Sequence, residues 1–276
     1  MNSALFLKDR LRPNSYYSIF GILRNWVVIA FIIWFNIHHW TIWLYIPSVW
    51  LIGGFQFTLG ECMLHNASHY TLFTKKGWHY KFEFLYSLPF FTTVKQYRKE
   101  HLKHHSHLGK PGKDNLITDY EKFGFSTPGC NYFWLWFIKP VIGYAGFFYV
   151  RKLRLKPFRG AGLKILLFWA MVLTCFSILH ITHIILLYWI IPLFWCHYSF
   201  LYWSEVSDHY NTRTGTRSNL NPIINLITHN NGYHYIHHKY PTIPWFRLPE
   251  TYKYLCDGEG DISNGFIDTY RQMKSS

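Results

Sequence analysis

Charged side chains are scarce in this chain and are absent from two long stretches. Only 15% of the 276 residues are charged, against roughly 25% in soluble domains. Aromatic residues make up 21%, which excludes a disordered chain. The five cysteines are scattered and form no C-x-x-C pair, so the sequence predicts neither a disulfide framework nor a zinc ribbon.

The two stretches without Lys or Arg are residues 25–74 and 165–212. A helix that crosses a membrane needs about 20 mostly apolar residues, so each stretch has room for two spans and a tight turn. We place the spans at about 22–37, 41–62, 163–180 and 183–204, with turns near 36–40 and 180–183. The prediction is an all-α integral membrane protein with four transmembrane helices in two hairpins.

Basic residues mark the predicted cytoplasmic side. The chain has 28 Lys and Arg against 14 Asp and Glu, a formal charge of +14, and every basic residue lies outside the two stretches. Because basic loops stay in the cytoplasm, both termini and a cap formed by about 65–160 and 205–276 are predicted to be cytoplasmic. The chain is thus a single membrane domain, 1–276, of a bacterial inner membrane or the endoplasmic reticulum. No nucleic-acid partner is expected, since the charge follows topology.

One further apolar segment, residues 131–150, is interrupted by Lys139-Pro140. We predict an interfacial aromatic helix there and no fifth span.

Histidine is unusually abundant, with 17 residues, and nine of them are candidate metal ligands: eight in three spaced groups, and His209 just after the fourth predicted span. The first group is H-x-x-x-H, and the next is H-x-x-H-H, a spacing that returns over a hundred residues later. Residues three and four apart share a helical face, so each group can aim its rings at one ion. Single histidines at the predicted turns (His38, His39, His180 and His183) are expected to be interfacial, and His79 and His107 to be solvated.

The number of candidate ligands limits which metal the site can hold. Structural zinc takes four ligands and catalytic zinc takes three with a water, so nine imidazoles are too many for one zinc ion. H-E-x-x-H, G-x-S-x-G and Walker A motifs are absent. The count favours two ions of higher coordination number, as in a dinuclear iron site; the residues alone leave the metal open.

The motifs "HNASH", "HLKHH" and "HYIHH", in this order around two predicted hairpins, resemble the three histidine boxes of the membrane fatty acid desaturase/hydroxylase superfamily. The flanks "HNASHYTLF", "YRKEHLKHHSHLGKPGKDNL", "EVSDHY" and "NNGYHYIHHKYPTIPWFRLP" extend the resemblance over about residues 20–250. One departure is Asn66, where the first box often carries an acidic residue after its first histidine.

The resemblance implies an O2-dependent, non-haem di-iron enzyme with two Fe2+ ions. By motif position its iron ligands would be His65, His69, His101, His104, His105, His209, His234, His237 and His238. Carboxylates close to these boxes can offset the metal charge and orient the rings; the candidates are Glu61, Glu205 and Asp208, with Asn231 as a hydrogen-bonding neighbour. Electrons would come from a separate ferredoxin or cytochrome b5.

Function is therefore predicted as desaturation of a fatty acyl chain. Hydroxylation of a lipid or other amphiphile shares the first hydrogen abstraction and is the alternative. A metal-binding or haem-binding membrane protein without catalysis is the alternative from another class.

Overall fold

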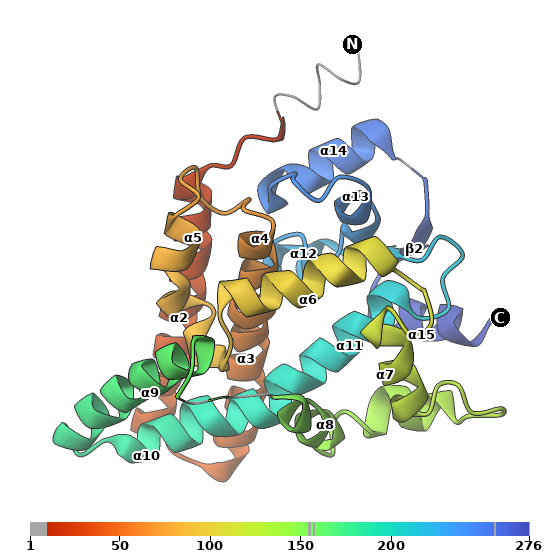
Figure 1. The fold of residues 1–276 in the computed structure, drawn as a ribbon. Helices are drawn as coiled ribbons and strands as arrows, with labels where there is room; N and C mark the ends of the chain where they lie inside the picture. Colours follow the sequence, from red (N-terminus) through yellow and green to blue (C-terminus); the bar gives the residue numbers. More distant parts are fainter. Residues whose placement is uncertain (1–9, 154–155, 157, 257, 276) are drawn as a thin grey trace.

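The computed structural model describes residues 10–153, 156, 158–256 and 258–275, and the chain is mostly helical (Figure 1). Within this described part of the chain, four helices are long and apolar enough to cross a membrane: Ser15–His38, Ile42–Ser68, Ala161–Ile178 and Thr182–His209. The four predicted spans are confirmed in number. The second and fourth continue beyond the predicted ends, because the histidine boxes extend the same helices.

These spans are built from α-helical and π-helical pieces. The first and third are the single helices α2 (Ser15–His38) and α9 (Ala161–Ile178). The second joins α3 (Ile42–Phe57), η1 (Thr58–Met63) and α4 (Leu64–Ser68). The fourth joins α10 (Thr182–Ile185), η5 (Leu186–Ile190), η6 (Leu193–His197) and α11 (Tyr198–His209).

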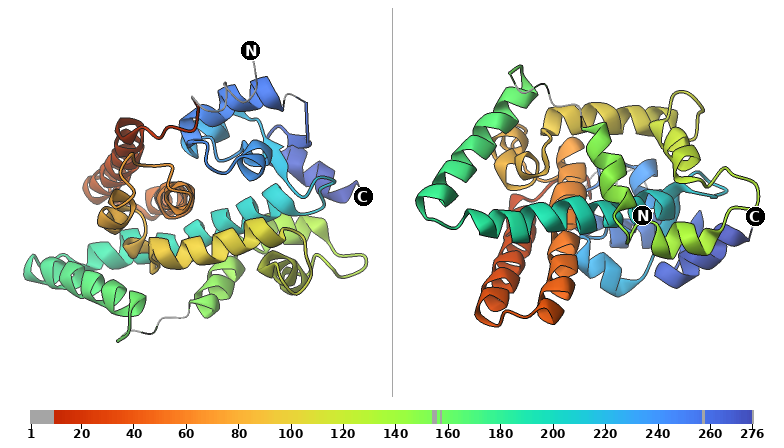
Figure 2. Two further views of the ribbon diagram at one scale, coloured as in Figure 1. Left: turned by 45° about the horizontal axis from the view of Figure 1, so that its top comes forward. Right: turned by 90° about the horizontal axis from the view of Figure 1, so that it is seen from below.

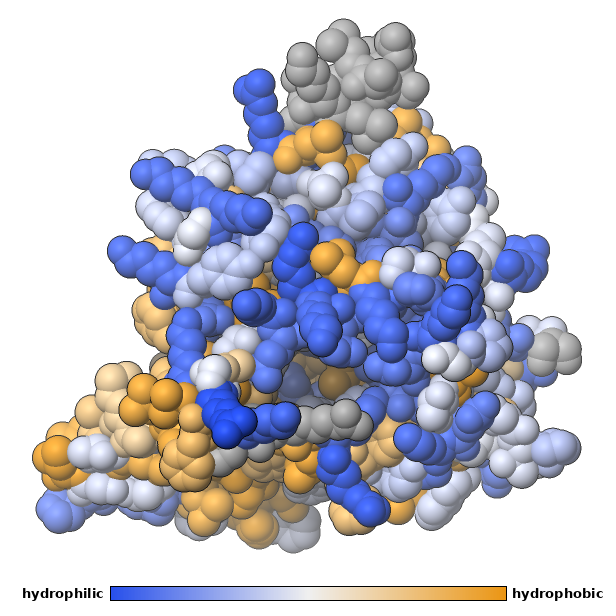
Figure 3. Space-filling model, in the orientation of Figure 1, coloured by the Kyte–Doolittle hydropathy of each residue, from blue (hydrophilic) through white to orange (hydrophobic). Residues whose placement is uncertain are grey.

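Apolar side chains cover the outside of these helices as well as the core. Ile29 and Ile52 are fully buried, whereas Phe31, Leu167 and Met171 are exposed. Helices satisfy their backbone polar groups internally, which lipid requires. The exposed apolar faces are therefore suited to contact with hydrocarbon, and Figure 3 shows hydrophobic side chains gathered around α9.

The ends of the spans that lead to the histidine boxes lie together. The Ser15 hydroxyl at the start of α2 is 3.2 Å from that of Thr74, just past the second span. Lys164 at the start of α9 pairs with Glu83, which lies between the first two boxes. At the opposite ends, Trp40 and His183 line one small cavity.

The remaining elements form a helical layer around these ends (Figures 1 and 2). Between the second and third spans lie α5 (Trp78–Lys81), η2 (Glu83–Leu85), η3 (Leu88–Phe90), α6 (Val94–His107), α7 (Asn115–Phe123), η4 (Trp134–Ile138) and α8 (Tyr144–Lys152). After the fourth span lie β1 (Arg217–Asn219), α12 (Pro222–Ile227), α13 (His234–Lys239), η7 (Trp245–Arg247), α14 (Leu248–Leu255), β2 (Asp261–Ser263) and α15 (Phe266–Lys274).

Strands β1 and β2 pair in parallel, with Ser218 opposite Ile262. The segment 131–150 differs from the predicted single interfacial helix: it contains η4 and the start of α8, separated by a turn in which Gly143 has φ +90°. Phe133, Trp134 and Phe147 remain exposed.

Candidate metal centre

Nine histidines from four separate segments meet at one place: the eight of the three boxes and His209, together called the box histidines below. His65 lies on α4 and His69 at its end, His101, His104 and His105 on α6, His209 at the end of α11, and His234, His237 and His238 on α13. The H-x-x-H-H spacing places three rings of α6 on one helical face. Helix α13 offers the same arrangement from the other side of the centre.

Five of these rings form one group that is able to hold a metal ion: His65, His69, His101, His105 and His237. One ligand nitrogen from each lies within 4.8 Å of all the others. The Nε2 atom of His101 is 2.9 Å from Nε2 of both His69 and His105. Ligands 90° apart on an ion with metal–nitrogen distances of about 2.1 Å are about 3 Å from each other, so these separations fit a shared ion.

A second group contains His104, His209 and His238, and His234 adjoins it with its Nε2 2.9 Å from that of His209. The ring of His238 also stacks on that of His105, with centroids 4.1 Å apart. The two groups are therefore contiguous, and with His234 they account for all nine residues.

Hydrogen bonds assign the tautomers of two rings in the second group. Nδ1 of His104 lies 3.1 Å from a carboxylate oxygen of Asp114, and Nδ1 of His209 lies 2.9 Å from the Gly215 carbonyl. Both partners are acceptors, so in a neutral ring each Nδ1 carries the proton and each Nε2 presents a lone pair. Those two Nε2 atoms face each other at 3.2 Å. Two lone pairs at that separation repel unless a cation lies between them.

Burial favours the neutral form in five of the rings. Burial lowers the pKa of His101, His234, His237 and His238 well below the usual value, and neighbouring rings lower it further. Burial likewise lowers the pKa of His105 to about 4. Neutral imidazole is the form that binds iron, copper, zinc and nickel, so this site is ready for a metal at neutral pH.

Carboxylates surround the centre at a greater distance. Glu61 accepts a hydrogen bond from Tyr97, and Glu205 accepts one from Tyr149. Asp208 accepts one from Ser204, and its nearest oxygen is 3.9 Å from Nδ1 of His234. Of these three predicted carboxylates, only Asp208 has an oxygen within 4.0 Å of a ring nitrogen of a box histidine.

Asn231 lies beside the His65 ring, and its role as a hydrogen-bonding neighbour stays a prediction.

Asp114 is a candidate site residue that the sequence analysis missed. Its carboxylate is buried and also accepts hydrogen bonds from the backbone NH groups of Gly109 and Leu116. These bonds fix it below the His104 ring. The available signal was its place in "GKPGKDNL", directly after the second box.

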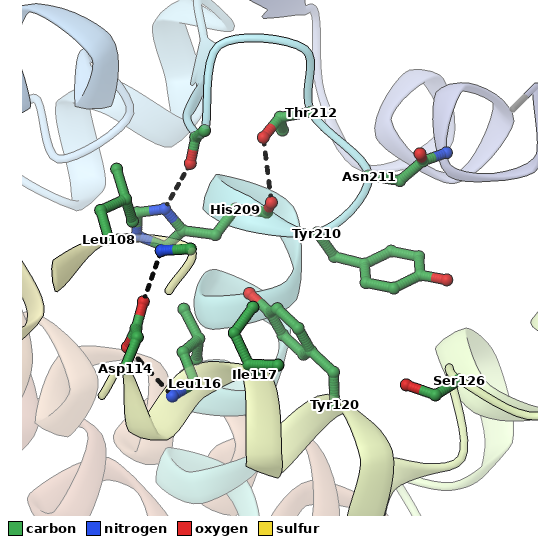
Figure 4. A pocket seen from close by; sticks show the side chains of 12 residues that line it. Leu108, Asp114, Leu116, Ile117, Tyr120, Ser126, His209, Tyr210, Asn211 and Thr212 are labelled. Carbon is green, nitrogen blue, oxygen red and sulfur yellow. Dashed lines mark hydrogen bonds between the residues drawn. The ribbon is translucent and has the colours of Figure 1, made fainter. Parts of the chain in front are cut away.

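A cavity of about 340 Å³ opens beside the second group (Figure 4). His209 and Asp114 lie on its inner wall, and Leu116, Ile117 and Tyr120 line its apolar side. It reaches the histidine centre at His209.

Other histidines are held outside the centre. His79, expected to be solvated, is 0% exposed; this prediction is wrong because its Nε2 accepts the backbone NH of Phe73 and its ring packs on Tyr70. His229 lies 2.9 Å from Arg24 and 3.0 Å from Asn25. His197 is buried against Phe57 and Phe90.

A model of the fatty acid desaturase family matches residues 38–260, which include all nine box histidines. The chain belongs to the fatty acid desaturase family. The resemblance seen in the three boxes is therefore confirmed, and membership supports an oxidoreductase of the desaturase/hydroxylase type that acts at a membrane.

Several characterised members of the family are similar to this chain. Dihydrorhizobitoxine desaturase of Bradyrhizobium elkanii is 29% identical, over 91% of this chain and 79% of its own length. Sphingolipid delta(4)-desaturase/C4-monooxygenase DES2 of Rattus norvegicus is 30% identical, over 73% of this chain and 68% of its own length. Human sphingolipid delta(4)-desaturase DES1 is 26% identical, over 72% of this chain and 64% of its own length.

Proposed function

We propose that this family member is an O2-dependent di-iron desaturase that introduces a carbon–carbon double bond into an acyl chain of a lipid. The single observation that carries the proposal is the facing pair of Nε2 atoms on His104 and His209, 3.2 Å apart within a cluster of nine histidine rings. A metal ion between these two atoms would satisfy both lone pairs, and the family supplies the chemical context.

The proposed ligands are the nine box histidines, divided between two iron ions. His65, His69, His101, His105 and His237 would surround one ion, and His104, His209, His234 and His238 the other. Asp114 and the Gly215 carbonyl hold the protons of His104 and His209 on Nδ1, so that Nε2 stays free for the ion.

When bound, the iron pair supplies the redox chemistry that couples O2 reduction to oxidation of an unactivated C–H bond. In the overall reaction a CH2–CH2 unit loses two electrons and two protons and becomes CH=CH. Two further electrons come from a donor and two protons from water, so that one O2 becomes two H2O. The chain's own contribution is to orient the rings and to limit their contact with bulk water, since His65, His69, His234 and His237 are buried and the other five are partly buried.

Hydroxylation is the second candidate function. The printed name of the rat relative covers both a desaturase and a C4-monooxygenase, so the two outcomes occur within one related protein. In hydroxylation, one oxygen atom enters the substrate as a hydroxyl group and the other leaves as H2O, with the same two donor electrons.

The charge pattern supports a membrane topology and a cellular membrane for this chain. We propose two helical hairpins with the termini and the histidine centre on the cytoplasmic face, in a bacterial inner membrane or the endoplasmic reticulum. The proximity of Ser15 to Thr74 and of Lys164 to Glu83 supports a common side for the centre-facing ends.

A catalytically inert metal-binding or haem-binding protein is the rival. It accounts for the histidine cluster, but it does not account for similarity to several desaturases. Iron analysis and lipid profiling separate the two.

The test compares wild type with His104→Ala and with His107→Ala as the matched control. His107 lies on the same helix, but its Nδ1 is 3.1 Å from the Lys103 carbonyl and its ring is outside both groups. We expect about two iron ions per chain in wild type and in the control, and fewer in His104→Ala. A new double bond in the lipids of expressing cells should be lost in His104→Ala alone.

A new hydroxyl group in place of the double bond would instead select the hydroxylase. Unchanged iron content in both His105→Ala and His238→Ala, with the fold retained, would refute the ligand assignment.

A further inference from the structure

Helix α6 has two chemically different faces. Its inner face carries His101, His104 and His105 of the metal centre. Its outer face carries Lys95, Lys99 and Lys103, all exposed and spaced four residues apart. At 100° per residue this spacing forms one continuous row on a helix, and we call these three residues the lysine stripe.

The lysine stripe has no carboxylate partner. Among the residues that the structure describes, ion pairs of lysine with a carboxylate are formed by Lys152, Lys164 and Lys239. Exposed Lys110 and Lys113 follow α6, whereas Glu100 is the single acidic residue of the helix. Lysines without acidic partners produce a positive electrostatic potential, which attracts an acidic surface.

The position of the stripe suits a protein partner better than lipid. Hydrophilic side chains cover the surface around α6, whereas the hydrophobic surface lies around α9 (Figure 3). Helix α6 is also separate from the four spans. A partner on the stripe would be separated from the histidines by one helix, about 10 Å thick with its side chains.

The proposed reaction requires such a partner. Each turnover of the proposed reaction consumes two electrons from a donor other than the substrate. A carrier docked on the lysine stripe would deliver them across α6, whose inner face holds His101, His104 and His105.

We propose that the lysine stripe is the docking surface for an acidic single-electron carrier protein, of the ferredoxin or cytochrome b5 class. This inference rests on the proposed oxidase function and names its partner surface. Two reduced carriers dock in turn, each is oxidised by one electron, and the two electrons enter the reduction of one O2.

The test is the charge-reversed triple variant Lys95→Glu, Lys99→Glu, Lys103→Glu. Its matched control is Lys253→Glu, Arg271→Glu, Lys274→Glu, which changes the same number of exposed charges on α14 and α15. The full-length, iron-loaded protein is placed in phosphatidylcholine nanodiscs, and binding of oxidised [2Fe–2S] ferredoxin and of soluble cytochrome b5 is titrated at low salt.

We expect the stripe variant to raise the dissociation constant of a carrier about tenfold or more and to weaken its salt dependence. The control should stay within about twofold of wild type. Iron content should be equal in all three proteins, because no lysine of the stripe contacts the centre. Oxidation driven by a small uncharged reductant should likewise be unchanged in the stripe variant.

Three results would overturn the docking surface. One is unchanged binding of both carriers by the stripe variant, and another is an equal loss in the control, which would indicate net charge alone. The third is unchanged carrier binding with loss of affinity for phosphatidylglycerol vesicles, which would assign the stripe to lipid. Binding of oxidised carrier needs no turnover, so wild type that binds through the stripe but forms no product contradicts the proposed function and leaves the docking surface standing.

Discussion

At the residue scale, the centre depends on groups that fix which ring nitrogen carries a proton. His104 and His209 are each oriented through Nδ1, one by a carboxylate and one by a backbone carbonyl. Such partners of metal-binding histidines typically change metal affinity 10- to 100-fold when they are removed. Asp114 is therefore as informative to mutate as a ligand.

Replacing Asp114 with Asn should weaken iron binding about 10- to 100-fold while the ligand set stays complete. The amide can present its NH2 group to His104, which favours the wrong tautomer. The measurement is iron content during titration with a chelator. Asp119→Asn is a control: Asp119 is also buried but pairs with Lys152. Equal iron retention in both variants would contradict the role given to Asp114.

Arg217 holds the backbone on both sides of His209 through hydrogen bonds. It is 2% exposed and donates to the carbonyl oxygens of Ser207, Tyr210 and Asn211 at the end of α11. Its Nε also donates to Gln272 of the C-terminal helix. The end of α11, with His209, is thereby tied to the last helix of the chain.

Arg217→Gln should lower the free energy of unfolding by about 1–3 kcal/mol, because buried carbonyls lose their donors. It should also reduce iron content. Arg217→Lys should restore the two properties only partly, since one ammonium group cannot reach all the acceptors. Chemical denaturation and iron analysis of both variants would measure this; wild-type values for Arg217→Gln would refute it.

At the element scale, α6 begins at a well-defined point. Thr93 and Gln96 form a capping box, and Glu83 accepts the NH of Val94. This start sets the register of Tyr97 and of the three histidines that follow.

Thr93→Ala should therefore cost about 1 kcal/mol of stability, measurable as a lower unfolding midpoint. Thr93→Ser keeps the hydroxyl and should retain most of it. A loss of equal size in both variants would indicate that the methyl group, and not the cap, is what matters.

Sequence patterns anticipated the elements that depend on local chemistry. The absence of Lys and Arg over 25–74 and 165–212 located the four spans, and histidine spacing identified the residues that meet at the centre. Sequence patterns did not predict contacts that form where the chain turns back on itself. Asp114 reaches His104 only because a turn at Lys110–Asp114 folds back, and His79 is buried by neighbours that its own spacing does not reveal.

At the scale of the whole molecule, the centre joins segments that are far apart in sequence. In the iron-free protein it is a buried cluster of rings whose pKa is lowered. As pH falls below about 6.5, the unfolded chain takes up protons on these histidines before the folded chain does. The free energy of unfolding is therefore higher at neutral pH than in acid. This extra stability is lost as pH falls from about 6.5 toward the lowered pKa values of the folded state.

The iron-free protein should accordingly show an unfolding temperature that falls as pH is lowered from about 7 to about 5. The iron-loaded protein should have a higher unfolding temperature at pH 7, because a ligand that binds only the folded state stabilises it. Differential scanning calorimetry in detergent at several pH values measures both effects. A pH-independent unfolding temperature without iron would contradict the burial of neutral rings.

Within the second span, the π-helical turn η1 lies between α3 and the histidines of the first box. A π turn contains one residue more than an α turn, so the register of the helix shifts between Phe57 and Leu64. Counting helical faces upward from the lipid-facing part of α3 consequently gives the wrong azimuth for His65. If this box were grafted onto an ideal α-helix, its rings would point away from their partners. The graft would have to include the π turn with its extra residue to keep their direction.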